Sequence, residues 1–335
     1  MVIPADLSSL SGKSVYLKFI SPLGFVADEY RLPIRQPALP VKTTNRLSSG
    51  TVKAQSNDRQ ITIKTGGLTV NIDKQTGLIH QANRDSNTLL IGGPLLMVLA
   101  LNGSGDTQMT RQMKPVSFDT AVRSNRKVEQ VSLTQETDTA AVTITDSYDI
   151  ARGTCKLTID SGGIMVIDYD YVLTAGINPR QYGIVMTLPG SFTQLHWQRK
   201  GLWTVYPEDH IARLEGTTDA LVGVKPCGIA GPSARPDYPW YHDTNTLGTN
   251  DFRSTKENII HAYLSSSSTR GPVIESDGNQ HVRCWIDGDV IRMLIAEYNN
   301  PGAEGFFRSH AALEDKPLKA GDKISGSVKF RLLDN

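Results

Sequence analysis

The sequence has 335 residues, and its 35 lysine and arginine residues against 34 aspartate and glutamate residues give a net charge of +1 at pH 7. A chain of this length can bury a large hydrophobic core, and one large domain with a smaller segment beside it is expected. The balanced charge gives no field that would attract nucleic acid or an anionic membrane, so neither is expected as a partner.

The three cysteines, Cys155, Cys227 and Cys284, stand far apart and in no metal-binding spacing. Neither a disulfide framework nor a metal site is therefore predicted, and no cofactor is expected. Cys155 and Cys284 lie in strand-like segments, where a buried thiol is the usual state. The apolar stretch 94–101 is too short to span a bilayer, and no signal peptide is visible at the N-terminus.

The first 45 residues contain two strand-like segments, 14–19 and 29–34, separated by a turn at Pro22 and Gly24. Two strands do not form a stable module alone, so residues 1–45 are predicted to be an added hairpin or the end of a small sandwich domain. The polar residues 46–59 are predicted to be a linker.

From Gln60 onward, apolar residues alternate with polar ones, the period of strands with one buried face. The segment Asp73–Gly77 is predicted to be the turn of a hairpin. Further strands are predicted at 128–135, 140–150, 155–159, 164–173, 182–188, 259–264, 281–286, 290–298 and 324–333. Only 303–313 could form a short helix. Many strands at irregular spacing indicate an all-β protein with a large antiparallel β-sandwich over 60–335.

Two aromatic stretches, 195–216 and 236–243, mix rings with charged residues. Sugars stack their C–H faces on aromatic rings and need directional hydrogen bonds for their hydroxyls, so these stretches are candidate carbohydrate-binding surfaces. An alternative is that the rings cap the core and the charges solvate its rim. The candidate residues in these stretches are Trp197, Arg199, Trp203, Tyr206, Asp209, Tyr238, Trp240 and His242. Arg253 is a further candidate in the segment 251–256, which mixes opposite charges along a predicted strand and is either a solvated face or a polar lining.

No motif of the common enzyme classes is present, and catalysis by paired carboxylates is not predicted. Glu208 and Asp209 are adjacent, and neighbours in an extended strand point to opposite faces. They therefore cannot flank one glycosidic bond, as glycoside hydrolysis requires. Asp209 is expected instead to contact a sugar hydroxyl or an arginine.

Four segments, in order, resemble the C-terminal domain of β-galactosidases of glycoside hydrolase family two. They are 68–95 with its DKQTG turn, 195–213 with its YPED sequence, 250–259 and 317–333. The order and spacing agree from about Gln60 to the C-terminus. The substrate-facing edge departs from the family, because Phe306 and Phe307 stand where some members have a tryptophan that reaches the active site.

The resemblance implies a galactose-mutarotase-like sandwich, with residues 1–45 as the end of an immunoglobulin-like domain. It implies a non-catalytic domain that binds carbohydrate or completes the rim of an active site, with Phe306 at the substrate edge. The catalytic glutamates of the family lie in a barrel that no segment here resembles. The expected partners are a galactoside-like glycan, the upstream domains and a second copy of the chain; the full-length enzyme is expected to be periplasmic or secreted.

Two alternatives remain open. The first is a stand-alone sugar epimerase of the mutarotase type, which needs a carboxylate and a histidine at the sugar ring, such as Asp209 or Glu208 with His210 or His242. The second is a structural or assembly sandwich without sugar contact.

If the aromatics bind sugar, Trp203→Ala and Trp240→Ala should weaken sugar binding and change the melting temperature little. If they belong to the core, each substitution should cost about 3–5 kcal/mol of stability without a specific binding defect. Calorimetric titration and thermal unfolding of the same variants distinguish these outcomes.

Overall fold

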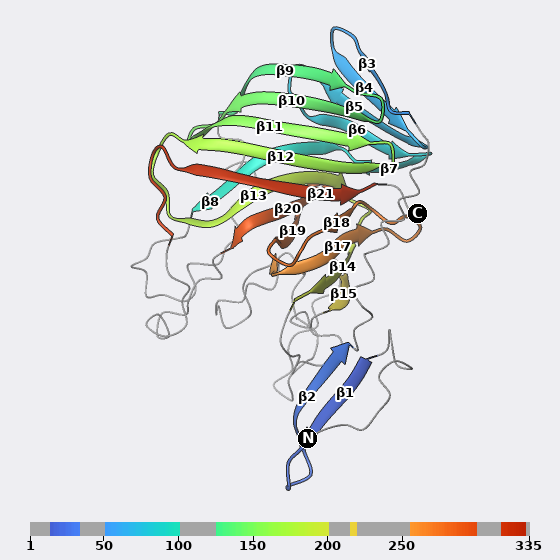
Figure 1. Ribbon diagram of the computed structural model, residues 1–335, viewed down its shortest axis with the longest axis vertical. Coiled ribbons are helices and arrows are strands. Elements are labelled where there is room, and N and C mark those ends of the chain that lie inside the picture. Colours follow the sequence, from blue (N-terminus) through green and yellow to red (C-terminus); the bar gives the residue numbers. More distant parts are fainter. Residues whose placement is uncertain are drawn as a thin grey trace.

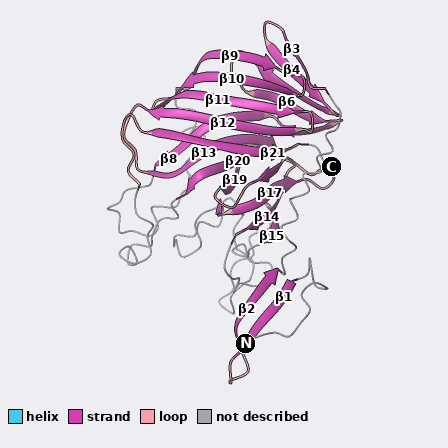
Figure 2. Ribbon diagram, in the orientation of Figure 1, coloured by secondary structure: helices cyan, strands magenta, loops and turns pink. Residues whose placement is uncertain are grey.

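The computed structural model describes residues 14–33, 51–100, 125–200, 215–219, 255–299 and 316–332. All secondary-structure elements within these ranges are β-strands, and all of the strands pair antiparallel (Figure 2). The prediction of an all-β antiparallel sandwich is confirmed. Within the described ranges, no helix has the length and apolar character needed to cross a membrane.

One layer of the sandwich is a nine-stranded sheet (Figure 1). β21 lies between β12 and β18, so the last described strand is an interior strand of this sheet. In sheet order the strands are β15 (Glu215–Asp219), β14 (Gln194–Arg199), β17 (Ile259–Ser265), β18 (Val273–Glu275), β21 (Lys323–Arg331), β12 (Ile164–Leu173), β11 (Ala151–Asp160), β10 (Thr139–Ser147) and β9 (Lys127–Gln135).

Two five-stranded sheets complete the sandwich. The first has the order β3 (Lys53–Ser56), β4 (Gln60–Thr65), β5 (Leu68–Asp73), β6 (Ile79–Arg84) and β7 (Asn87–Leu90). The second has the order β16 (Thr255–Lys256), β19 (His281–Asp287), β20 (Val290–Asn299), β13 (Pro179–Pro189) and β8 (Gly92–Ala100). The chain passes from β7 directly into β8, and the backbone N–H of Ile91 donates to the carbonyl of Thr187 at 2.9 Å. The two sheets therefore adjoin.

The main core contains apolar side chains from all three of these sheets. Ile61 and Ile63 alternate with polar residues on β4, and Val142 and Ile144 do so on β10. Because the side chains of a strand alternate between its faces, this spacing puts one face of each strand in the core. Burial of each such side chain contributes on the order of 1.5–3 kcal/mol.

The N-terminal segment forms a separate hairpin of β1 (Ser14–Ile20) and β2 (Val26–Pro33). The turn between these strands contains Gly24 with a φ of 87°, as predicted for this position. Among the described residues, the large apolar side chains that remain exposed all lie in this hairpin, with Leu23 85% exposed. Its assignment to an immunoglobulin-like domain stays a prediction.

The linker prediction for 46–59 is wrong for residues 53–56, which form β3 and pair with β4. β3 is an edge strand with polar, largely exposed side chains, so its sequence lacks the apolar alternation of the other strands. Val52, just before it, is buried in the core. The candidate helix at 303–313 lies outside the described residues.

The predicted turn between β5 and β6 is present. The Asp73 carboxylate accepts hydrogen bonds from the backbone N–H of Thr76 at 2.7 Å and from its hydroxyl at 2.8 Å. These bonds lower the pKa of Asp73. Gly77 closes the turn with a φ of 65°, which favours glycine.

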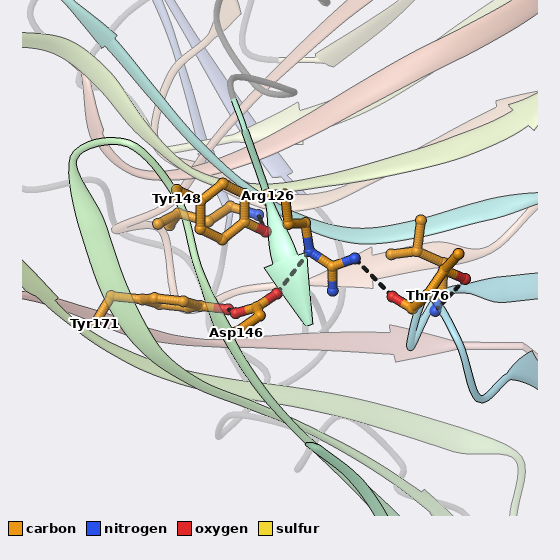
Figure 3. A network of polar contacts seen from close by, with 7 residues as sticks. Thr76, Arg126, Asp146, Tyr148 and Tyr171 are labelled. Carbon is orange, nitrogen blue, oxygen red and sulfur yellow. Dashed lines mark hydrogen bonds and ion pairs between the residues drawn. The ribbon is translucent and has the colours of Figure 1, made fainter. Parts of the chain in front are cut away.

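A buried ion pair links this turn to the nine-stranded sheet (Figure 3). Arg126 Nε donates to Asp146 at 2.6 Å, and Arg126 Nη1 donates to the carbonyl of Thr76 at 2.6 Å. The Tyr171 hydroxyl donates to the other oxygen of Asp146 at 2.7 Å. Tyr148 packs edge-on against Tyr171, and its hydroxyl accepts from the backbone N–H of Leu96 on β8. The network therefore touches all three sheets of the sandwich.

Removing one member of a buried ion pair leaves the other charge buried without compensation. Asp146→Ala should therefore lower the free energy of unfolding by about 3–5 kcal/mol. The matched control is Asp170→Ala on the same sheet, whose exposed pair with Lys323 should contribute less than about 1 kcal/mol. Urea unfolding measures both, and equal losses in the two variants would contradict the role given to Asp146.

Candidate functional site

A cluster of polar side chains lies on the second five-stranded sheet, on the face turned away from the main core. That face is otherwise covered by a small apolar cluster of Leu95, Met97, Leu99, Val185, Trp285, Leu294 and Ala296. Arg283 lies on the same face, two residues before Trp285, and its guanidinium carbon is 5.7 Å from the centre of the indole ring. The polar cluster therefore borders a buried apolar cluster that includes the ring of Trp285.

Gln181 is at the centre of the cluster and is fully buried. Its side-chain amide donates to Thr255 Oγ1 at 2.9 Å and to Asn299 Oδ1 at 2.7 Å. Arg283 Nη1 donates to Gln181 Oε1 at 3.0 Å. Strands β13, β16, β19 and β20 thus each contribute one side chain to a connected set of hydrogen bonds.

Glu257 extends this set toward solvent. Asn299 Nδ2 donates to Glu257 Oε1 at 2.6 Å, which fixes the orientation of the carboxylate. Burial raises the pKa of Glu257, although the hydrogen bond from Asn299 and the nearby Arg199 both favour the charged form. The site therefore holds a half-buried carboxylate whose affinity for a proton is increased.

The backbone at Glu257 turns from one layer of the sandwich into the other. β16 pairs with β19 in the five-stranded sheet, whereas β17 pairs with β14 in the nine-stranded sheet. Asn258, between them, has a φ of 55°, a conformation that asparagine tolerates better than most residues. The carboxylate of Glu257 therefore stands at a corner where the two layers separate.

His281 lies at the same corner. The backbone N–H of Asn258 donates to His281 Nδ1 at 3.3 Å, so the proton of the neutral ring is on Nε2. Burial lowers the pKa of His281 to about 4. His281 thus has a neutral imidazole with a defined tautomer, held by the residue that follows Glu257 in the chain.

This arrangement provides a partly exposed carboxylate and imidazole next to buried amide, hydroxyl and guanidinium groups and a buried apolar cluster. Such groups can donate to and accept from the hydroxyls of a small polar ligand. A carboxylate and an imidazole can also transfer protons. Among the described residues, no group of three or more histidine, cysteine or acidic side chains could hold a metal ion.

Of the predicted binding residues, Trp197 is 3% exposed and belongs to the main core. Its ring lies against Gly216 of β15, where a Cβ atom would come within 2.6 Å of the indole. Lys256 Nζ is 5.2 Å from the ring centre. This location favours the alternative that Trp197 is a core residue, and its contact with a sugar stays a prediction.

Arg199 ends β14 and lies close enough to Glu257 to affect its pKa, so it joins the site. The other predicted binding residues lie outside the described residues: Trp203, Tyr206, Asp209, Tyr238, Trp240, His242, Arg253 and Phe306. So do Glu208, His210 and Cys227. Cys155 and Cys284 are buried free thiols, as predicted.

The prediction from sequence missed Gln181, Glu257, His281, Arg283 and Asn299. One signal was present for Arg283, because a charged residue in the middle of the apolar strand β19 requires a buried partner. Thr255 lies in the segment 251–256, which the sequence predicts to be either a solvated face or a polar lining. Nothing in the spacing of the other residues along the chain indicates that they meet.

The partly buried His281 should make stability depend on pH. Its pKa is about 4 in the folded protein, below the ordinary value of 6.5, so the unfolded chain takes up a proton first as the pH falls. Stability from this residue is complete above about pH 6.5 and falls by up to about 3 kcal/mol toward pH 4. Replacing His281 with asparagine should remove this part of the pH dependence, measured by urea unfolding at pH 7.5 and 4.5. The exposed His80→Asn is the control, and an unchanged pH profile in His281→Asn would contradict the assignment.

No protein-family model and no curated protein matches the sequence. The resemblance to the β-galactosidase domain therefore stays a prediction.

Solved structures do share similarity with this chain over most of its length. A putative aldose 1-epimerase from Escherichia coli K12 has 10% identity and a TM-score of 0.42, with 85% of this chain and 99% of that chain covered. A galactose 1-epimerase from Lactobacillus acidophilus has 9% identity and a TM-score of 0.32, with 96% and 98% covered. A beta-arabinopyranosidase has 10% identity and a TM-score of 0.39, with 79% and 38% covered. Because these TM-scores are low, the fold assignment rests on the strand order of the chain itself.

Proposed function

We propose that this protein binds a carbohydrate at the corner formed by Glu257, with Asn299, Gln181 and Arg283 holding the site in place. The observation that carries the proposal is the connected set of hydrogen bonds from four strands that ends at the partly exposed carboxylate of Glu257. Burying polar groups costs free energy unless they form hydrogen bonds. The presence of a buried hydrogen-bond network in this sheet therefore needs an explanation other than packing.

The neighbourhood of the cluster supports a sugar as the ligand. β14 ends at Arg199, β16 begins at Thr255 and β20 ends at Asn299. The predicted aromatic candidates belong to the chain segments that follow or precede these strand ends. Carboxylates bind sugar hydroxyls and aromatic rings bind their C–H faces, so residue types for both kinds of contact occur next to these strand ends in the sequence.

The resemblance to the C-terminal domain of family-two β-galactosidases supports a role for this sugar binding within a larger enzyme. In that setting the sandwich is an accessory domain of a β-galactosidase-like glycoside hydrolase, and the catalytic glutamates lie in a barrel domain outside this chain. The sandwich binds the glycan or forms the rim of the active site, and bond cleavage requires the complete enzyme.

A second candidate function is aldose 1-epimerisation, and the hydrogen bond that His281 accepts from Asn258, the residue next to Glu257, favours it. Opening a sugar ring requires that a base take the proton of the anomeric hydroxyl while the ring oxygen receives a hydrogen bond or proton. Glu257 has the raised pKa of a suitable base, and neutral His281 carries a hydrogen-bond donor at Nε2 because its Nδ1 accepts from Asn258. Closure of the ring on the opposite face then gives the other anomer.

Calorimetric titration with D-galactose, D-glucose and L-arabinose tests sugar binding. Glu257→Gln removes a charged hydrogen-bond acceptor, so it should weaken binding by about 10- to 100-fold. The exposed Glu129→Gln on β9 is the matched control and should bind as the wild type does. Absence of binding by the folded wild-type chain would favour the structural sandwich without sugar contact.

Two activity measurements separate the remaining functions. Polarimetry of freshly dissolved α-D-galactose should show catalysed mutarotation only if the chain is an epimerase, and Glu257→Gln and His281→Asn should then each abolish it. A panel of aryl glycosides should not be hydrolysed by this chain alone, and hydrolysis would contradict the accessory role.

A further inference from the structure

Strand β20 contains a bulge just before the site. Ala296 pairs with Gly183 and Tyr298 pairs with Tyr182 on β13, which leaves Glu297 as an extra residue between two paired positions. A bulge inserts one residue into a strand and changes the face to which the following side chains point. Each residue after Glu297 therefore points to one face of the sheet, whereas without the bulge it would point to the other.

The change of face has a direct effect on the proposed sugar site. Ile291, Met293 and Ile295 point into the main core, and regular alternation would place Asn299 in the core as well. With the bulge, Tyr298 packs on the core side in a stack with Tyr182, at 5.5 Å between ring centres. Asn299 then lies on the opposite face, where it contacts Gln181 and Glu257.

Glu297 itself extends between the two layers of the sandwich. The side-chain amide of Gln280 donates to Glu297 Oε1 and also to the backbone carbonyl of Ser327 on β21, the latter at 2.8 Å. Burial raises the pKa of Glu297, and the contacts with Gln280 and the backbone of Ser327 oppose this rise. The bulged residue is thus connected to strand β21 of the opposite layer through Gln280, which lies just before β19.

The opposite layer provides space for the carboxylate at Gly326. A Cβ atom at this position would lie 2.7 Å from Glu297 Cδ and Oε1, so any larger residue would displace the carboxylate. Tyr169 pairs with Gly326 on the neighbouring strand, and its buried hydroxyl has no hydrogen-bond partner among the described residues. Burial and the adjacent Glu297 both raise the pKa of Tyr169, so it stays an uncharged phenol. The space between the two layers at the bulge is thus occupied by one carboxylate, that of Glu297.

We propose that Glu297 is a positioning residue for the proposed sugar site, which holds the β20 bulge and thereby turns Asn299 toward Glu257. This inference rests on the proposed function for its consequence in binding, but the geometry it describes can be tested without a sugar. Glu297 acts through Asn299 and has no contact with the ligand.

The test uses the full chain labelled with 15N-asparagine, so that the side-chain amide of Asn299 gives its own NMR signal, identified by its loss in Asn299→Asp. In the wild-type background, Glu257→Gln should shift this signal, because Asn299 donates to Glu257. In Glu297→Ala the bulge loses its anchor, so the signal should move and should no longer respond to Glu257→Gln. Glu297→Gln keeps an oxygen that accepts from Gln280, and it should retain the wild-type response.

A second variant keeps the proposal testable if Glu297→Ala does not fold. Gln280→Met has a similar shape but cannot donate to Glu297 or Ser327, so it should also abolish the response of Asn299 to Glu257→Gln. An unchanged response in Glu297→Ala or, if that variant is unfolded, in Gln280→Met would overturn the positioning role.

Titration with D-galactose separates this inference from the proposed function. If both hold, Glu297→Ala should weaken binding about tenfold, which corresponds to one hydrogen bond, and Glu297→Gln should restore it. If the wild type binds no sugar but the NMR response behaves as described, the sugar site is wrong and the positioning role stands. If the wild type and Glu297→Ala bind equally and the Asn299 signal is unchanged, the positioning role is wrong.

Discussion

The buried ion pair between Asp146 and Arg126 is the interaction on which the packing of the sandwich depends. Apolar contacts have no preferred direction, whereas a buried charge is costly unless it is paired and hydrogen-bonded. Arg126 joins the carboxylate of Asp146 to the turn at Thr76, and Tyr171 and Tyr148 extend the contacts to β12 and β8. These polar contacts join the three sheets at defined points, in addition to the apolar core that they share.

Irregular backbone occurs where the layers separate, and the candidate site lies there. Asn258 adopts a positive φ where the chain crosses from β16 to β17, and β20 has its bulge at Glu297. Bulges and unusual backbone conformations are common next to functional sites, where they redirect single side chains. Glu257 and Asn299 owe their meeting to these two irregularities. Without the bulge, regular alternation would turn Asn299 toward the main core and away from Glu257.

Much of the fold could be predicted from sequence, because the patterns that identify its strands and turns extend over only a few neighbouring residues. The alternation in β4 and β10, and the aspartate and glycine of the turn at Asp73–Gly77, identify strands and turns within a few residues. β3 was missed because an exposed edge strand needs no apolar alternation. The site was largely missed for a different reason: Gln181, Glu257 and Asn299 come from strands far apart in the chain, and the bulge that unites them has no recognisable sequence pattern.

The position of β21 affects how the protein folds. The strands β3 to β7 pair only with their neighbours along the chain, so this sheet can form early through short loops. The nine-stranded sheet, in contrast, consists of two separate halves until β21 inserts between β12 and β18. During synthesis on the ribosome, the inner edges of β12 and β18 remain unpaired until the segment 323–331 emerges. These open edges make the incomplete chain prone to aggregation, so the slowest and most vulnerable step of folding should be the insertion of this strand.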